Sequence, residues 1–381
     1  MEIYFDNSAT TIIHPDIQKS VYHNLQKAYG NPSSIHSLVL EANNILDKAR
    51  NQLSRLVNCS PSEIYFTNSG TFANNLSILG RARFIQANNL GKHIITSAIE
   101  HPSILGPIKY LESQGFMVTY LKPDHNGQIQ TQTVINALTK NTSIVSIMWA
   151  NNEIGSLFPI QDLAQKLAQL NIFFHTDAIQ VAGKLNIDLE QVQVSTLSLS
   201  GHKFHAPKGI GAIFIRKGIN LMPIIFGGGQ EMGYNPGTHA LTNIEALGQA
   251  SELAKNNLNR YQDNLRQLQN YLINEISQLP NTVLTGPITS DLRLPGHVSF
   301  ATSLYNAEAL VNKASLKGLY LSSGSACKAG IKEPSHVLKC LDLPEDYLNG
   351  AIRISLSQFN TMSECQTAIE ILKRILLAKD N

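Results

Sequence analysis

The stretch Ser200–Phe214, SGHKFHAPKGIGAIF, decides the fold of this chain. It places Lys203 between a histidine and a turn rich in Gly and Pro, and a short apolar run follows that turn. Upstream, the apolar run in IFFHTDAIQ (172–180) ends at Asp177. Short apolar runs bounded by turn residues are typical of buried strands. We therefore expect Lys203 and Asp177 to follow two strands of one sheet, at the edge where ligands bind.

An amine and a carboxylate at these two positions are what a pyridoxal phosphate enzyme requires. The Lys203 amine would form a Schiff base with the cofactor, and the Asp177 carboxylate would keep the pyridine nitrogen protonated so that the ring accepts electrons. A surface lysine in a Gly-rich loop is the simpler interpretation of the tripeptide GHK taken alone. Several other segments favour the cofactor.

Composition limits the class of protein. The 381 residues are 43% hydrophobic and 15% charged, which predicts a large core and two domains. A net charge of +2 without a Lys/Arg block argues against a nucleic-acid groove or a polybasic membrane surface. No apolar run reaches the about 18 residues of a membrane span, and MEIYFDNSATT lacks a signal-peptide core. We expect a soluble, unprocessed, cytoplasmic protein.

The four cysteines form no C-x-x-C pair, so their spacing supports neither a metal site nor a disulfide framework. They are Cys59, Cys327, Cys340 and Cys365.

Apolar strands alternate with helical stretches from about residue 64 to residue 215, which predicts an α/β protein with a mainly parallel sheet covered on both faces. Polar residues follow these strands: His101 after IITSAIE, Asn152 after VSIMWAN, and Gln180 beyond Asp177. His101 could cap a helix or act as a catalyst, and residue type alone leaves both open. The small-residue turn SGT precedes another helix, whose first N–H groups suit a phosphate.

A long helix begins, by this interpretation, at a capping box formed by Thr242 and Glu245 and runs to about Gln278. The domain boundary lies along it. We expect a loop over residues 1–12 that contributes to the substrate site, a large cofactor-binding domain over 13–248, and a smaller α/β domain over 249–381.

Five motifs together resemble the cysteine desulfurases, which have the class-V aminotransferase fold. They are GNPSSIH (30–36), SAIEHPSI (97–104), SGHK (200–203), GSAC (324–327) and AIRISL (351–356). The resemblance extends over nearly the whole chain. It implies a fold type I pyridoxal phosphate enzyme that forms a homodimer.

The same resemblance assigns roles to residues. Gly70, Thr71, Ser200 and His202 would hold the cofactor phosphate, and Thr238 would reach the phosphate in the partner subunit. His101 would stack on the ring and shuttle protons, beside Lys203. Asp177 would bind the ring nitrogen and Gln180 the ring hydroxyl. Asn152 and Arg353 would bind the substrate carboxylate.

Cys327 lies among small residues in SSGSACKAG (322–330), followed by EPSHVL (333–338), as in the long-loop subgroup of desulfurases. The resemblance implies that L-cysteine is converted to L-alanine, that Cys327 carries the sulfur as a persulfide, and that an iron–sulfur scaffold or a tRNA thiolation enzyme accepts it. Two alternatives stay open. One is a selenocysteine or cystine lyase, in which Cys327 is dispensable, and the other is a cofactor-binding regulatory or assembly partner.

Three departures from the family pattern bear on these roles. Phe72 stands where the family usually has Glu, and Asn235 stands where it has Arg before Pro-Gly-Thr or Ser-Gly-Thr. The chain also ends at Asn381, without the further tail of long-loop members that contact an iron–sulfur scaffold. We expect these departures to affect the rate or the acceptor and to leave the chemistry unchanged.

Overall fold

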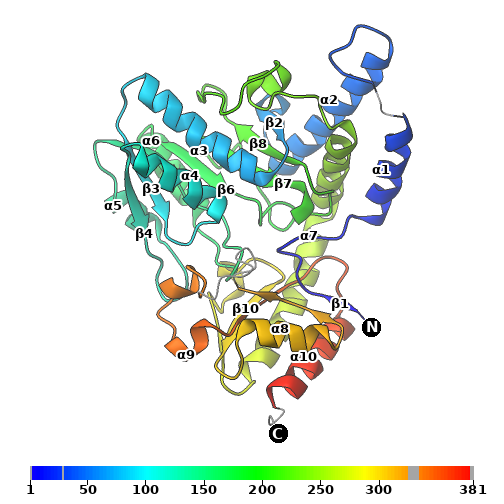
Figure 1. Ribbon diagram of the computed structural model, residues 1–381, viewed down its shortest axis with the longest axis vertical. Helices are drawn as coiled ribbons and strands as arrows, with labels where there is room; N and C mark the ends of the chain where they lie inside the picture. Colours follow the sequence, from blue (N-terminus) through cyan, green and yellow to red (C-terminus); the bar gives the residue numbers. More distant parts are fainter. Residues whose placement is uncertain (1, 28–29, 325–333, 378–381) are drawn as a thin grey trace.

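Two sheets organise the part of the chain that the computed structural model describes, residues 2–27, 30–324 and 334–377 (Figure 1). The larger sheet has seven strands, in the order β2 (Ile64–Thr67), β8 (Gly211–Ile215), β7 (Thr196–Ser200), β6 (Phe173–Asp177), β5 (Thr142–Ser146), β3 (His93–Ser97) and β4 (Met117–Leu121). Strand β8 is antiparallel to both of its neighbours, and the remaining pairs are parallel. The predicted, mainly parallel α/β sheet is confirmed.

Helices cover both faces of this sheet, because successive strand residues point to opposite sides. Ile94 and Phe173 pack with α3 (Gly70–Ala87) and α4 (Pro102–Ser113). Their neighbours Ile95 and Phe174 join the other core, with α2 (Leu38–Val57), α6 (Ile160–Gln169) and the first half of α7 (Leu241–Ser277). Both faces of the strands are therefore buried, which explains their nearly continuous apolar sequence.

The smaller sheet is antiparallel, in the order β12 (Ser322–Ser323), β13 (Ala351–Ser355), β10 (His297–Thr302) and β9 (Thr282–Leu284). Its core includes the second half of α7, α8 (Ala307–Ser315) and α10 (Met362–Leu376). Strand β1 (Ile3–Tyr4) pairs in parallel with β11 (Leu319–Tyr320) and buries Ile3 and Phe5 in the same core. The start of the chain therefore belongs structurally to this second half.

The remaining helices are short or peripheral. They are α1 (Pro15–Lys27), α5 (Thr131–Asn136), α9 (Glu345–Leu348) and the 3-10 turns Pro61–Glu63, Gly201–Lys203, Gln230–Gly233, Ser290–Leu292 and Leu338–Cys340. No helix in the described ranges is both long enough and apolar enough to cross a membrane.

Helix α7 runs through both cores, and its start corrects one prediction. It begins at Leu241, and Ala240, the residue before it, makes no side-chain capping bond. Thr242 is thus already inside the helix, where it cannot act as the N-cap, because that residue must precede the helix. The predicted capping box is wrong, whereas the predicted end lies within one residue of Ser277. The predicted boundary between residues 248 and 249 falls inside α7 and stays a prediction.

Candidate active site

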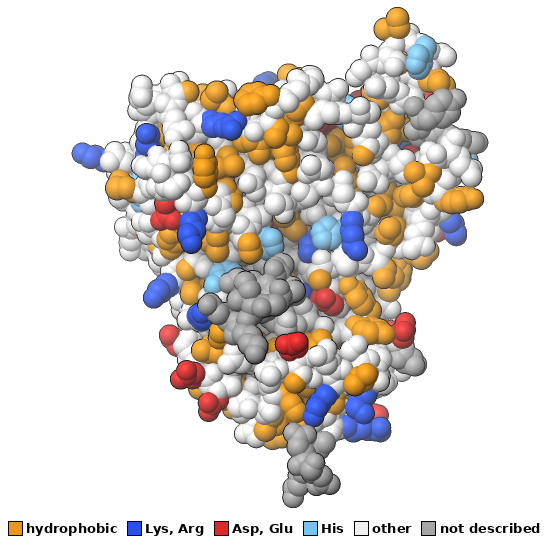
Figure 2. Space-filling model, in the orientation of Figure 1, with side chains coloured by type: hydrophobic (Ala, Val, Ile, Leu, Met, Phe, Trp, Pro, Cys, Tyr) orange, Lys and Arg blue, Asp and Glu red, His pale blue; other side chains and the backbone are white. Residues whose placement is uncertain are grey.

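The candidate site lies where β6 and β7 end and where α3 and α4 begin. Asp177 is the last residue of β6, Ser200 is the last residue of β7, and Lys203 closes the 3-10 turn that follows. His101 immediately precedes α4, and Gly70 is the first residue of α3. Figure 2 shows histidine, lysine and arginine side chains grouped in the middle of one face, where the two halves of Figure 1 meet.

The Lys203 amine faces the start of the chain. Its Nζ donates to the backbone carbonyls of Ser8 at 2.6 Å and Ala9 at 2.8 Å. The backbone of the preceding turn holds the same segment, because the N–H of Thr11 donates to the carbonyl of His202 at 2.9 Å. The expected loop over residues 1–12 therefore lies directly against the candidate cofactor lysine.

The Asp177 carboxylate is 6% exposed and is held at both oxygens. Asn74 Nδ2 donates to Oδ2 at 2.7 Å, and the backbone N–H of Ile179 donates to Oδ1 at 2.9 Å. The side chain is fixed in place and can serve as a buried anion.

His101 performs the capping role that its sequence position left open. Its Nδ1 accepts from the backbone N–H of Ser103 at 3.1 Å, at the start of α4. Burial lowers the pKa of His101; Asp177 raises that pKa, and Lys203 and His336 lower it. The charge on the His101 imidazole therefore responds to both Asp177 and Lys203. Capping thus orients the ring and leaves Nε2 for chemistry.

The start of α3 forms a narrow cradle beside Ser200. A Cβ atom added at Gly70 would lie 2.3 Å from Ile179 Cδ1 and 3.1 Å from Ser200 Cβ, so a larger residue there would require the Ile179 side chain to move. The first N–H groups of a helix have no partner within it, and the helix dipole adds positive potential. Thr71, the next residue, is exposed.

His202 lies in the turn before Lys203, and its Nδ1 contacts Thr10 Oγ1 at 3.2 Å. Burial, together with Lys203 and Lys208, lowers the pKa of His202 to about 4.

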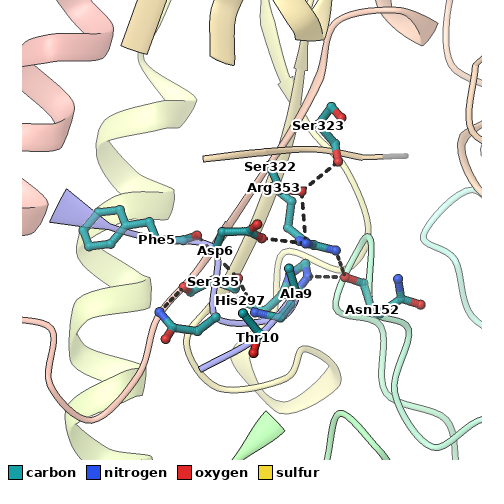
Figure 3. A network of polar contacts seen from close by, with 12 residues as sticks. Phe5, Asp6, Ala9, Thr10, Asn152, His297, Ser322, Ser323, Arg353 and Ser355 are labelled. Carbon is teal, nitrogen blue, oxygen red and sulfur yellow. Dashed lines mark hydrogen bonds and ion pairs between the residues drawn. The ribbon is translucent and has the colours of Figure 1, made fainter. Parts of the chain in front are cut away.

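Arg353 lies on β13, and its side chain is 3% exposed. Its Nη2 donates to Asp6 Oδ1 at 2.7 Å and to Ser322 Oγ at 3.1 Å, and its Nη1 donates to the Asn152 carbonyl at 3.1 Å (Figure 3). The Asn152 side chain points away from the guanidinium. Asn152 and Arg353 therefore lie together, but through the backbone of Asn152, and their binding of a substrate carboxylate stays a prediction.

The other predicted residues have different surroundings. Gln180 donates from Nε2 to the Ser8 carbonyl at 3.1 Å, and its buried Oε1 has no hydrogen-bond partner among the described residues. Thr238 is exposed in the Gly-rich segment PIIFGGGQEMGYNPGT (223–238), and no hydrogen bond within the described ranges joins it to Lys203 or Asp177. Cys327 lies outside the described residues.

Residues that sequence patterns did not single out complete the site. Asp6 and Ser8 contact Arg353 and Lys203, and Asn74 and Ser103 contact Asp177 and His101; all four are described above. Asn74 follows Gly70 by about one helical turn, so it faces the same side of α3. That spacing was a usable signal, whereas nothing in the sequence announced the approach of Asp6 to β13.

Both side-chain departures have structural partners. Phe72 is half-buried and packs against the core between α3, α4 and the sheet. Asn235 Nδ2 donates to the carbonyl of Phe66 at 3.1 Å, near the end of β2. A glutamate at position 72 would lose the apolar packing of Phe72. An arginine at position 235 would be too long for the short contact that Asn235 makes with the Phe66 carbonyl.

Comparison with known proteins identifies the family. Residues 3–367 match the sequence profile of the family described as "Aminotransferase class-V". The chain belongs to the class-V aminotransferases. It is 37% identical to "Cysteine desulfurase IscS" of Dictyoglomus turgidum over 98% of this chain and 94% of that protein. It is 38% identical to "Cysteine desulfurase" of a Nostoc species over 98% and 92%.

Solved structures agree with this class-V aminotransferase assignment. A "NifS-like protein" matches 99% of this chain and 100% of its own, with a TM-score of 0.92 and 33% identity. "SspA in complex with cysteine" matches 95% and 100%, with a TM-score of 0.82 and 33% identity.

Class-V aminotransferases and cysteine desulfurases depend on pyridoxal phosphate, and the residues present fit that cofactor. An amine for its aldehyde, a buried carboxylate for its ring nitrogen, and a helix start closely packed at Gly70 lie together at one edge of the sheet. The buried Gln180 Oε1 without a described partner is a further polar atom that a ligand could satisfy.

Proposed function

We propose that this protein is a cysteine desulfurase that converts L-cysteine to L-alanine and retains the sulfur as a persulfide on Cys327. The observation that carries the proposal is the joint placement of Lys203, Asp177 and His101 after the ends of three parallel strands, β7, β6 and β3. Sequence similarity to cysteine desulfurases over nearly the whole chain supports it, as does the related structure described as bound to cysteine.

Lys203, Asp177 and the start of α3 would hold pyridoxal phosphate, which supplies an electron sink for the α-carbon of the substrate. Gly70, Thr71, Ser200 and His202 would bind its phosphate, and Gln180 its hydroxyl. The roles below belong to the chain itself.

Lys203 would take the α-proton of the substrate, since its amine is the base held in the site by Ser8 and Ala9. His101 would move a proton at Nε2, because its Nδ1 already accepts a hydrogen bond. Arg353 would bind the substrate carboxylate with its planar guanidinium, aided by the neighbouring Asn152.

Cys327 would attack the substrate sulfur as a thiolate. The carbon–sulfur bond breaks, a sulfur–sulfur bond forms, and the three-carbon product takes up protons to leave as alanine. The described cysteines are poorly suited to this step, because a raised pKa leaves little thiolate near neutral pH. Burial is the larger cause and a nearby glutamate the smaller one, and together they raise the pKa of Cys59 and of Cys365 to about 12. The pKa of Cys340 is raised mainly by burial as well.

A homodimer is part of the proposal. Large apolar side chains are exposed on the arm formed by α1 and α2 and on the Gly-rich segment, with Leu25 and Leu40 each 71% exposed, Phe226 84% and Met232 80%. Patches of this kind mark protein contacts. A second copy would cover them and bring its Thr238 to the neighbouring site.

The acceptor would be an iron–sulfur scaffold or a tRNA thiolation enzyme, met in the cytoplasm. The three described cysteines are free, which suits a reducing compartment.

The test supplies L-cysteine and a reductant to the purified, cofactor-loaded protein and measures alanine and sulfide. We expect both products in equal amounts. Cys327→Ser should lose them, whereas Cys340→Ser, the matched control, should keep them. Undiminished alanine from Cys327→Ser would contradict the persulfide step and favour a selenocysteine or cystine lyase. No alanine from the wild type would favour a regulatory partner.

A further inference from the structure

A continuous chain of buried polar side chains runs behind the candidate site, from the middle of the large sheet to the start of α4. Its members come from β7, β6, α3 and α4. They are Thr196, Ser77, His175, Asn74, Ser103 and His101. Ser77, Thr196, His175 and Asn74 are each 0% exposed. None of these four has a role in the function proposed above.

The inner half of the chain connects the sheet to α3. Ser77 Oγ lies 2.7 Å from Thr196 Oγ1, which lies 2.9 Å from His175 Nδ1. His175 Nε2 then lies 3.1 Å from Asn74 Oδ1. Both nitrogens of this fully buried imidazole therefore have protein atoms as partners, Thr196 Oγ1 and Asn74 Oδ1.

The outer half branches at Asn74. Its Nδ2 donates to Asp177 Oδ2 at 2.7 Å and to Ser103 Oγ at 2.8 Å. Ser103 Oγ lies 2.7 Å from His101 Nδ1, and the backbone N–H of Ser103 donates to the same nitrogen at 3.1 Å. One amide group therefore contacts both the carboxylate and, through one hydroxyl, the imidazole.

The donor direction of every bond follows from one fixed donor. A backbone N–H can only donate, so His101 Nδ1 is an acceptor, and the Ser103 hydroxyl, which also faces it, donates to it. That hydroxyl must then accept from Asn74 Nδ2, which leaves Asn74 Oδ1 to accept from His175 Nε2–H. His175 is neutral, since burial lowers its pKa to about 3, so its Nδ1 accepts from Thr196.

We propose that His175 and Asn74 are positioning residues that reinforce this direction, so that Asp177 receives an N–H and a second donor, the Ser103 hydroxyl, helps to keep the His101 proton on Nε2. The inference rests on the proposed function for the roles of Asp177 and His101. His175 contacts neither of them. It acts by holding the Asn74 amide in one of its two orientations.

The reverse orientation of the Asn74 amide would change the hydrogen bonds at both Asp177 and Ser103. A flipped amide would place Oδ1, an acceptor, against the Asp177 carboxylate and against the Ser103 oxygen. The Ser103 hydroxyl would turn to donate to the amide, and His101 Nδ1 would lose the shorter of its two contacts. The backbone N–H of Ser103, 3.1 Å away, would then be the one donor left to Nδ1, so the preference of the His101 proton for Nε2 would weaken. His175 opposes this flip by offering a donor to Asn74 Oδ1.

The test compares His175→Gln with His175→Asn. The Gln side chain places an amide N–H near the position of imidazole Nε2, where it can reach Asn74, whereas Asn mimics Nδ1 and falls short. The readout is NMR of ¹⁵N-histidine-labelled, cofactor-free protein, with His101 assigned from a His101→Gln sample. We expect the wild type and His175→Gln to hold the His101 proton on Nε2. His175→Asn should show a smaller share of His101 with the proton on Nε2, because only the Ser103 backbone N–H then donates to Nδ1.

A kinetic readout accompanies it in the loaded enzyme. Loss of one charge-assisted hydrogen bond to Asp177 corresponds to about a tenfold effect, and it should appear in kcat for His175→Asn. KM for L-cysteine should stay within about twofold, since neither residue contacts Arg353. His175→Gln should recover most of kcat.

A second pair of variants serves if His175→Asn does not fold. Thr196→Val keeps the shape of the side chain and removes the donor to His175 Nδ1, so a proton can move to Nδ1 and leave Nε2 as an acceptor facing Asn74. It should change the His101 signals as His175→Asn does. Ser198→Ala, the control, removes a buried hydroxyl without a described partner from the same strand.

His101 signals unchanged in both His175→Asn and Thr196→Val would overturn the inference. Because the NMR readout needs neither cofactor nor turnover, it decides this point even if the protein forms no alanine. If the protein forms alanine and the His101 signals of both variants are unchanged, the desulfurase proposal stands and only the positioning role is contradicted.

Discussion

The Asp6 carboxylate lies 2.7 Å from Nη2 of Arg353, the arginine proposed to bind the substrate carboxylate. Asp6 follows β1, and Arg353 lies on β13, so this ion pair ties the start of the chain to the smaller sheet. A carboxylate of the protein thus already occupies part of the guanidinium. The substrate carboxylate must share it or displace Asp6.

Replacing Asp6 by Asn should lower KM for L-cysteine several-fold, because a neutral amide competes less well for a guanidinium than a carboxylate does. Arg353 should stay in place, since Ser322 and the Asn152 carbonyl still accept from it. Steady-state kinetics measure the change, with Asp16→Asn on exposed α1 as the control. A rise in KM would instead mean that Asp6 mainly orients Arg353.

Replacing Lys203 by Ala should abolish turnover and the visible absorbance of covalently held pyridoxal phosphate, because that bond needs the amine. The same change removes two hydrogen bonds to the carbonyls of Ser8 and Ala9. Hydrogen exchange in residues 8–11 should therefore become faster in cofactor-free protein. A Lys208→Ala control should leave both properties unchanged, and an active Lys203→Ala protein would refute the assignment.

Glu231 should be a large source of acid-sensitive stability. Burial alone would raise its pKa, but hydrogen bonds from His239 and Arg50 lower it to about 2. Because the folded pKa is depressed, the stability is present above the usual pKa near 4.5 and is lost as pH falls through about 2. Its loss corresponds to about 3 kcal/mol.

Glu231→Gln should therefore be less stable than the wild type at neutral pH, and the difference should shrink as the pH falls below about 4.5. Denaturant unfolding at several pH values measures it. The exposed acid Asp47, changed to Asn, provides the control on the same helix as Arg50. A difference independent of pH would contradict this account.

Glu100 should have the opposite effect. It is 0% exposed, Ser97 and the Met148 N–H both donate to its Oε1, and its Oε2 has no hydrogen-bond partner among the described residues. Burial, only partly offset by these two donors, raises its pKa to about 8. Between the usual pKa near 4.5 and about 8 the folded state keeps a proton that the unfolded state releases, so stability falls as pH rises.

Glu100→Gln removes this penalty, since an amide oxygen can accept both hydrogen bonds. The variant should gain stability relative to the wild type as pH rises from about 4.5 to 8, by on the order of 1–3 kcal/mol. Thermal unfolding across that range measures the gain, and Glu41→Gln on the exposed surface should show none. A variant less stable than the wild type at pH 8 would mean that Glu100 is ionised in the fold.

The fold was predictable because its signals are local. Short apolar runs such as Ile94–Ser97 and Phe173–Asp177 report burial on both faces, and the polar residue at each strand end reports the ligand edge. This is why Lys203, Asp177 and His101 could be placed together. The start of α7 was not predictable from a capping pattern. The helix begins at Leu241, which is only 6% exposed and packs in the core, so it starts before Thr242.

What the sequence could not supply are contacts between distant segments. Asp6 and Arg353 are 347 positions apart, and Asn74 meets Asp177 across 103 positions. Such pairs are decided by how the two sheets and their helices pack, which residue type alone does not reveal. Phe72 illustrates the same limit, since its fit against α3 and α4 depends on the core that surrounds it.

The pairing of β1 with β11 also fixes the order in which a nascent chain can mature. Ile3 and Phe5 leave the ribosome first, yet the core that buries them begins only at Leu265 and the strand that pairs with β1 only at Leu319. The seven-stranded sheet is complete in sequence at Ile215 and can form while synthesis continues. Until translation approaches its end, β1 therefore has no partner strand, and the segment that contacts Lys203 is held only by its own contacts with the turn at residues 202–205.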